Sequence, residues 1–257
     1  MLYTLLTVML FIMPFLISQN DGSHPGLYTG LWISLFFWGR MHALFSILVF
    51  SVSAVYYVIC SREQTTPSVS ASWIPRQGTR PLTVFLAVLM VFCAFGNVCM
   101  DFGMTLQLDT AAQQASLFLG FAGSLAGPVF FGFLNDRAGT FTAFMFLLAF
   151  GFLSLVLIAL SPDYLHLFFF GSLFMQAVIG GVFTLMPLML LRFYGRPQLP
   201  FVLPFLLLFL AALWAAARQF YKTADVPPQD YLLCMVFLLT MAAPLAAKAW
   251  RRRLTVL

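Results

Sequence analysis

The chain has 257 residues, of which 62% are hydrophobic and only 8% are charged. Soluble domains carry about 25% charged residues, so this chain lacks the polar side chains needed to cover a water-facing surface, and we expect it to lie in a lipid bilayer. The net charge of +5 is divided among the ends of apolar runs and forms no single basic stripe, which excludes nucleic-acid binding.

Apolar runs of membrane-spanning length recur along the chain. A spanning helix needs ~20 mostly apolar residues. Eight runs approach that length: roughly 2–18, 43–60, 81–100, 112–134, 141–160, 165–190, 198–217 and 231–247. No basic region precedes the first run, so we interpret it as a retained helix rather than a cleaved signal peptide, with a signal anchor as the alternative. The sequence therefore predicts an all-α, multi-pass membrane protein with about eight transmembrane helices.

The stretch 27–38 is apolar but short. At a rise of ~1.5 Å per residue it cannot cross a ~30 Å hydrocarbon core alone. It is either a re-entrant or interfacial piece, or it joins 43–60 in one long, bent helix. Arg40 interrupts the pattern, and we place it at an interface because a charge at mid-bilayer costs several kcal/mol.

The distribution of Lys and Arg predicts the orientation. With the polar linker 61–80 in the cytoplasm, ten basic residues lie inside and three lie outside, a clear positive-inside bias. The chain then divides into N-terminal membrane segments (1–60), the cytoplasmic linker (61–80), a six-helix membrane bundle (81–250) and a basic cytoplasmic tail (251–257). The C-terminus is accordingly predicted to be cytoplasmic.

One polar stretch between two apolar runs carries a recognisable pattern: Gly132-Phe133-Leu134-Asn135-Asp136-Arg137-Ala138-Gly139. It resembles the loop G-x-L-x-D-R-x-G-R-R of the major facilitator superfamily of transporters. The fixed positions that match are Gly132, Leu134, Asp136, Arg137 and Gly139, whereas the two trailing basic positions are Thr140 and Phe141. The resemblance implies a cytoplasmic gate loop in which Asp136 and Arg137 pair with helix ends and hold one face closed. An Asp near a helix N-terminus meets the positive end of the helix dipole. The alternative is two solvated loop charges.

The resemblance covers about residues 38–250. The bundle 81–250 is similar to the C-terminal half of a facilitator, with the matching loop between its second and third spans. Residues 180–196 weakly resemble the tenth helix of the oxalate/formate and monocarboxylate branch. Facilitators have twelve spans and this chain has room for about eight. The resemblance therefore implies a homodimer, a second membrane polypeptide that supplies the missing helices, or a reduced relative that no longer transports.

Four polar residues are candidates for a substrate or ion path: Asn97, Asp101, Gln176 and Thr184. In facilitators the span equivalent to 81–100 lines the central cavity, and Asn97 and Asp101 share one helical face there. A buried carboxylate binds a proton or a cation near working pH. The alternatives are that Asp101 marks the outer water interface and that Gln176 makes a hydrogen bond between helices.

Gly120, Gly123 and Gly127 are three and four residues apart in the run 112–134. Small residues at this spacing allow two membrane helices to approach closely. The three glycines predict close packing of this helix against a neighbour. The alternative is a bend that takes part in gating, and the two are compatible in a transporter whose bundles move against each other.

No motif for catalysis, phosphate binding or metal binding is present. The four cysteines are separate, and their surroundings are those of small buried hydrophobes. We therefore predict no enzyme activity, no cofactor and no metal.

The leading hypothesis is secondary transport of a small polar solute or organic anion by alternating access. The late helices carry no Lys or Arg at depth, which leaves the substrate open. The alternative is a transporter-derived structural subunit or assembly factor of a membrane complex, without transport activity.

Overall fold

The computed structural model describes residues 26–27, 29–31, 33–34, 79–99, 110–161, 164–194 and 228–254, together with residues 206, 209, 212–213, 215–217 and 219–220. Within these residues all the regular secondary structure is α-helical, which confirms the predicted all-α class. The long helices are α4 (Thr79–Cys99), α6 (Thr110–Ala138), α7 (Thr140–Ala159), α8 (Leu165–Tyr194) and α10 (Pro228–Leu254). The described residues of 26–34 are also helical, and we refer to them as segment 26–34.

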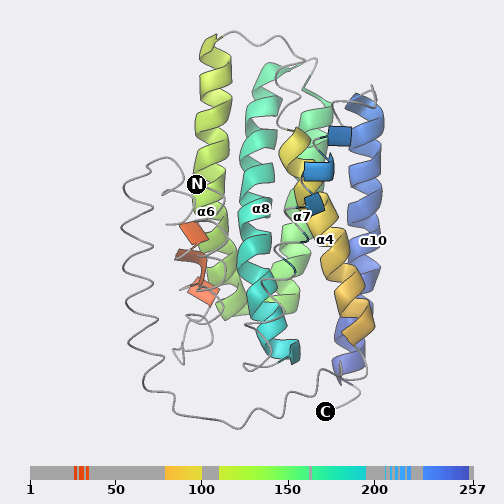
Figure 1. Ribbon diagram of the computed structural model, residues 1–257. Coiled ribbons are helices and arrows are strands. Elements are labelled where there is room, and N and C mark those ends of the chain that lie inside the picture. The colour runs from red at the N-terminus through yellow and green to blue at the C-terminus, as the bar shows by residue number, and fades with distance from the viewer. Residues whose placement is uncertain are drawn as a thin grey trace.

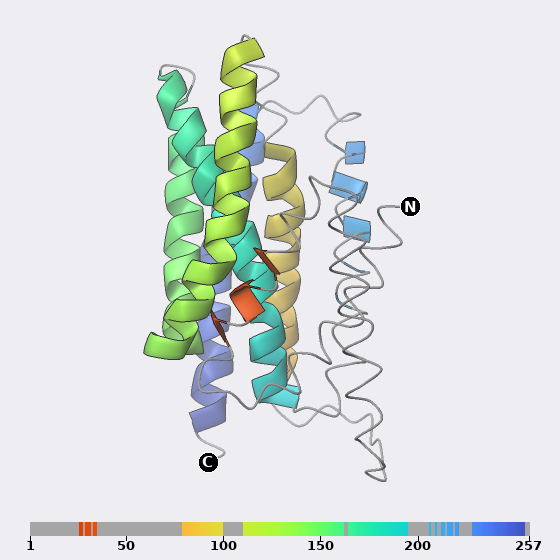
Figure 2. The ribbon, with the colours of Figure 1, turned by 90° about the vertical axis from the view of Figure 1, so that its left-hand side faces the viewer.

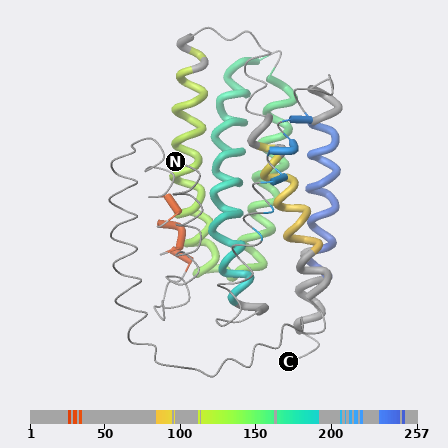
Figure 3. The backbone as a smooth tube through the Cα atoms, viewed as in Figure 1, coloured from red at the N-terminus to blue at the C-terminus, as the bar shows by residue number. Residues whose placement is uncertain are grey.

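The long helices lie side by side along one common direction (Figures 1 and 3). Helix α8 is central. Its apolar stretch is 78% buried, against 39% for the stretch in α6 and 44% for that in α7. The most extensive contact in the bundle is between α6 and α8, followed by the contacts of α7 with α8 and of α4 with α10. Segment 26–34 lies beside the half of α6 that leads into α7 (Figure 2).

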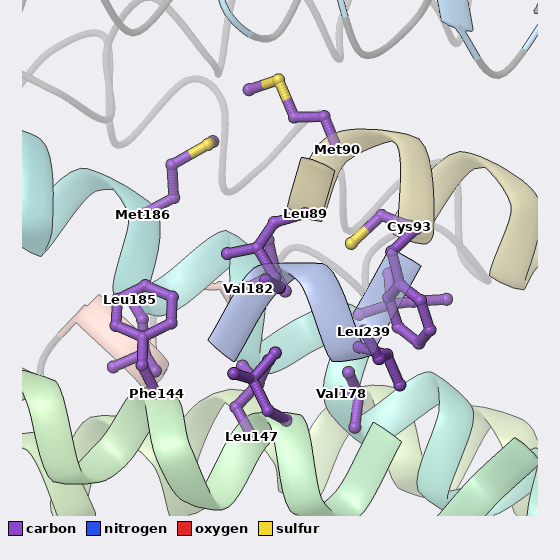
Figure 4. Close-up of a cluster of buried hydrophobic side chains, with 14 of the residues drawn as sticks. Leu89, Met90, Cys93, Phe144, Leu147, Val178, Val182, Leu185, Met186 and Leu239 are labelled. Atoms are coloured by element: carbon purple, nitrogen blue, oxygen red, sulfur yellow. The ribbon is translucent and has the colours of Figure 1, made fainter. Parts of the chain in front are cut away.

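The core is formed by aliphatic, aromatic and Met side chains from all five long helices, and Figure 4 shows part of it. Leu89 of α4, Leu147 of α7 and Leu185 of α8 are almost completely inaccessible to solvent, and Leu239 of α10 lies in the same cluster. The ring of Phe85 meets that of Phe144 edge to face at 5.3 Å between centroids, an arrangement that aromatic pairs favour. This cluster holds α4 and α10 against the α7–α8 pair.

The outside of the bundle is apolar as well. Leu117 and Phe118 of α6 are 71% and 70% exposed, and Leu233 and Phe237 of α10 are 66% and 61% exposed. A helix that is apolar all round is suited either to a protein core or to lipid. Because these side chains face outward, their natural surroundings are the acyl chains of a bilayer.

Within the described residues, three helices are long and apolar enough to cross a membrane: Gln114–Ala138, Thr140–Ala159 and Leu165–Leu191. They correspond to the predicted runs 112–134, 141–160 and 165–190. Shorter apolar helices cover Val84–Ala94 and Leu232–Leu245. The predicted runs 2–18 and 43–60 lie outside the described residues, as does nearly all of the linker 61–80, and 198–217 is described only in part.

The predicted loop over 132–139 is corrected by the structure. Helix α6 continues through Ala138, and α7 begins at Thr140, so Gly139 alone separates them. The N–H of Gly139 still donates to the carbonyl of Asn135 at 3.0 Å, and the carbonyl of Gly139 accepts the first bond of α7, from Ala143, at 3.0 Å. Gly139 turns the chain with φ 86° and ψ 159°, a conformation essentially restricted to glycine. The polar residues of the motif therefore occupy the last turns of a helix, with fixed directions.

Candidate functional site

Asp136 lies at the end of α6 and binds the backbone of segment 26–34. Its Oδ1 accepts a hydrogen bond from the N–H of Gly26, and its Oδ2 accepts one from the N–H of Leu27, each at 2.8 Å. A carboxylate that accepts from two successive backbone N–H groups satisfies both donors and sets its negative charge directly against the backbone of the segment.

Segment 26–34 packs against α6 through its smallest residues. Gly26, Gly30 and Ser34 are spaced by four residues and therefore share one face. A β-carbon on Gly26 would overlap the carbonyl oxygen of Gly132, and one on Gly30 would overlap the carbonyl of Pro128. The two backbones are in direct contact, which is the geometry that small-residue spacing permits between membrane helices.

Ser34 adds a polar contact at the far end of this interface. Its hydroxyl donates toward the carbonyl of Leu125 in α6 at 2.6 Å and toward its own helix at Gly30 at 2.9 Å. The segment is therefore held at one end by the Asp136 carboxylate and at the other by the Ser34 hydroxyl. Between them lie the contacts of the two glycines.

Two buried polar side chains stand behind Asp136. Asn135 is 2% exposed and donates from Nδ2 to Asp136 Oδ1 at 3.1 Å. Thr140, the first residue of α7, is 1% exposed and donates from its hydroxyl to Asn135 Oδ1 at 2.6 Å. The carboxylate is thus joined by hydrogen bonds to the segment on one side and to the start of α7 on the other.

Arg137 points away from this network. It is exposed, and its guanidinium carbon lies 5.1 Å from the centre of the Phe133 ring, within cation–π range. Among the described residues no carboxylate forms an ion pair with Arg137. Of the two charged motif residues, only Asp136 forms hydrogen bonds with segment 26–34 in the part of the chain that the structure describes.

The predicted packing glycines lie on another face of α6, toward α8. Gly120, Gly123 and Gly127 are all buried. A β-carbon on Gly123 would overlap the carbonyl of Leu173, and one on Gly127 would overlap the carbonyl of Ala177. Ser116, one turn before Gly120, lies 3.5 Å from the hydroxyl of Ser172 in α8. Helix α6 therefore has two close-contact faces, one for α8 and one for segment 26–34.

The α8 glycines accommodate side chains of α6. The Pro128 ring lies against Gly180, and the Phe131 ring lies against Gly181. Pro128 lacks an N–H, so it cannot complete the helical bond to the carbonyl of Ser124. That carbonyl faces Gly180 at 3.3 Å from the position of a β-carbon.

The predicted path residues are not brought together within the described part of the chain. Asn97 is in the last turn of α4, with its side chain outside the description, and Asp101 lies outside the described residues. Gln176 is half-buried near the middle of α8 and has no hydrogen-bond partner among the described residues. Thr184 is completely buried, and its hydroxyl donates to the carbonyl of Gly180 in its own helix at 3.1 Å.

The face of α8 that carries Gln176 can be located from neighbouring contacts. Gly171 lies against Ile158 of α7, and Ile179 lies against Gly96 of α4. Ala177 lies against Gly127 of α6. At 100° per residue, Gln176 falls between the α4 side and the α6 side and points away from α7.

The sequence interpretation missed the segment that Asp136 binds, and the face formed by Gly26, Gly30 and Ser34 through which this segment packs on α6. Their four-residue spacing was the available signal. The signal is weak because the stretch 27–38 is short and the spacing does not name a partner. Among the described residues no group of three or more His, Cys, Asp or Glu side chains is placed to hold a metal ion.

No protein-family model, no curated protein and no solved structure matches this chain. The functional argument therefore rests on the contacts of its own residues.

Proposed function

We propose that this chain is a transporter-like membrane protein that moves a small polar solute by alternating access, with the contact between Asp136 and segment 26–34 as a gate latch. The observation that carries the proposal is the pair of bonds from the N–H groups of Gly26 and Leu27 to the Asp136 carboxylate. The resemblance of residues 132–139 to the facilitator motif supplies the functional class.

The latch joins two parts of the chain that lie on either side of the predicted linker. Segment 26–34 precedes residues 61–80, and α6 follows them. Alternating access is a movement of one such part against the other about a central site. Under the proposed orientation Asp136 is at the cytoplasmic end of α6, so the bound state is the one closed to the cytoplasm.

The strength of the contact is suited to a switch. A hydrogen bond to a charged group contributes about 1.5–3 kcal/mol. Two such bonds favour the closed state, and a solute with a differential affinity of a few kcal/mol is able to reverse that preference. The extended glycine contact between α6 and α8 instead buries backbone against backbone over several turns, and we assign it to the rigid part of the bundle.

Gln176 is our candidate for the solute path on α8. It is half-buried and without a partner among the described residues, on the face between α4 and α6. A polar side chain at membrane depth that makes no bond to the described residues is our candidate for contact with a solute or with water. Asn97 and Asp101 complete the proposed path from the other end.

One observation favours the alternative, a transporter-derived subunit or assembly factor without transport. Thr184, a path residue in the sequence prediction, is completely buried and bonded to Gly180 of its own helix. Its role in the described structure is packing. If all the interior polar groups were satisfied in this way, no group would be left inside the bundle to bind a solute.

Uptake into proteoliposomes distinguishes the two functions. The purified chain is reconstituted and offered radiolabelled formate, oxalate and lactate, because the weak resemblance of residues 180–196 is to carriers of such anions. We expect uptake of at least one, lost in Gln176→Ala and in Asp101→Asn and retained in the matched control Gln114→Ala, whose side chain is exposed near the start of α6. Normal uptake in both path variants would contradict the path. No uptake of any probe, with loss of a native complex in Gly123→Leu, would favour the subunit.

The proposal also implies a partner, because about eight spans are too few for a two-half transporter. The mass of the complex released from native membranes in mild detergent tests this. The chain itself has a mass of 28.8 kDa. A homodimer or a stoichiometric second membrane polypeptide is expected, and a monomer would contradict two-half transport.

A further inference from the structure

We propose that Asn135 and Thr140 are positioning residues that hold the Asp136 carboxylate in the orientation needed to bind segment 26–34. The two side chains form one line of hydrogen bonds that ends on the carboxylate. The Thr140 hydroxyl donates to Asn135 Oδ1 at 2.6 Å, and Asn135 Nδ2 donates to Asp136 Oδ1 at 3.1 Å. The inference rests on the proposed gate, which it extends from one residue to a three-residue unit.

The direction of each bond follows from the chemistry of the groups. An ionised carboxylate only accepts, so the atom of Asn135 that faces Asp136 has to be the NH₂ group. The amide oxygen then faces Thr140, and only a donor satisfies it, so the Thr140 hydroxyl has to donate. The opposite amide orientation would set its oxygen against the carboxylate oxygen. The carboxylate thus sets the amide orientation, and the Thr140 hydroxyl supports it by satisfying the amide oxygen.

Burial makes the loss of either hydrogen bond costly. Asn135 is 2% exposed and Thr140 is 1% exposed, so water does not replace a lost partner at either side chain. A buried polar group without a hydrogen bond is strongly disfavoured. Asp136 itself is only half-buried, and without its neighbours its side chain would be free to turn toward water.

The arrangement connects α7 to segment 26–34 through the side chains of Asn135 and Asp136. Thr140 is the first residue of α7, and Gly139 sets the direction in which α7 leaves α6. A change in the angle between α6 and α7 moves the Thr140 hydroxyl relative to Asn135, and the amide loses its orientation. The latch is thereby coupled to the α6–α7 turn, which is a property that Asp136 alone would not have.

Selective labelling provides a specific probe, because the sequence contains Gly–Leu only at Gly26–Leu27 and Gly30–Leu31. Carbonyl-¹³C glycine combined with ¹⁵N leucine therefore selects two amides by NMR. Leu27 donates to Asp136 Oδ2, and Leu31 lies one turn further along the same segment. Hydrogen exchange of the full chain in lipid nanodiscs is compared for wild type, Asn135→Leu, Thr140→Val and Thr140→Ser, with Asp136→Ala as reference.

We expect Thr140→Val and Asn135→Leu to accelerate Leu27 exchange roughly tenfold, the effect of losing one supporting hydrogen bond, while Leu31 is unchanged. Thr140→Ser keeps the hydroxyl and should restore the wild-type rate. Unchanged Leu27 exchange in Thr140→Val, or equal acceleration of Leu27 and Leu31, would overturn the positioning role. Acceleration in Asp136→Ala alone would leave the latch intact and reject only this inference, whereas no response in Asp136→Ala would reject the latch itself.

Discussion

Gly26 and Gly132 lie so close together that a β-carbon on either would overlap the carbonyl oxygen of the other. The same Gly26 donates its N–H to Asp136, one turn further along α6. Close approach and the carboxylate bond are therefore parts of one contact, because Gly132 and Asp136 lie one turn apart on α6 and both meet Gly26. This explains why a glycine and an aspartate four residues apart act together.

Gly132→Leu is predicted to release segment 26–34 from α6 while the rest of the bundle stays folded. A leucine there would clash with backbone atoms of Gly26, which cannot move aside as a flexible side chain can. Both labelled amides, Leu27 and Leu31, should then lose protection in hydrogen exchange, with the helical content retained by circular dichroism.

Two variants serve as controls for Gly132→Leu. Phe133→Leu changes the next residue, whose side chain is 45% exposed, and should leave both amides protected. Gly127→Leu introduces the same clash against Ala177 of α8 and should instead reduce the yield of folded protein. Retained protection of Leu27 and Leu31 in Gly132→Leu would show that the glycine contact does not hold the segment.

Gly139→Ala is predicted to destabilise the turn between α6 and α7 by about 1–3 kcal/mol. The cause is the backbone conformation, φ 86° and ψ 159°, because no heavy atom lies within 4 Å of a β-carbon at this position. The check is the free energy of unfolding in detergent, compared with Ala138→Ser, an exposed substitution one residue earlier. Equal stability of the two variants would exclude strain at Gly139.

The motif around Asp136 could be recognised from the sequence because its positions are local and chemically distinctive. Its partner could not. Segment 26–34 is 110 residues away from Asp136 at Gly26, and nothing in a short-range pattern specifies such a pairing. The spacing of Gly26, Gly30 and Ser34 indicates a close-packing face, but it does not identify the helix that uses it.

The polar path was harder to predict for a related reason. A hydroxyl inside a helix is able to bond the carbonyl four residues earlier, and Thr184 does so with Gly180. The hydroxyl proton is then used within the helix and is not available to a solute. Gln176 makes no such bond to a described residue and is half-buried. Which of these situations applies depends on the rotamer and on the surrounding helices, and neither is encoded in the residue type.

The proposed orientation predicts that the two ends of α6 lie on opposite sides of the membrane. Ala138 is exposed at one end and Gln114 is exposed near the other. In a cysteine-free background, Gln114→Cys should react with an impermeant maleimide on intact cells. Ala138→Cys should react only after the membrane is opened. The reverse pattern would invert the topology, and reaction of both on intact cells would contradict a spanning α6.

The contact between Asp136 and Leu27 is the centre of this account, and a distance measurement by solid-state NMR tests it most directly. The chain is studied in lipid with ¹³C at the aspartate side-chain carboxyl. The Leu27 and Leu31 nitrogens are selected, as above, by combining carbonyl-¹³C glycine with ¹⁵N leucine. With dephasing made frequency-selective for the aspartate carboxyl, so that the directly bonded glycine carbonyl does not contribute, we predict dephasing of the Leu27 nitrogen by a carboxyl carbon within about 4 Å, as a direct N–H···O bond requires. The Leu31 nitrogen should show none, and the Leu27 effect should disappear in Asp136→Asn. A Leu27 nitrogen that is not dephased in the wild-type protein would contradict the latch.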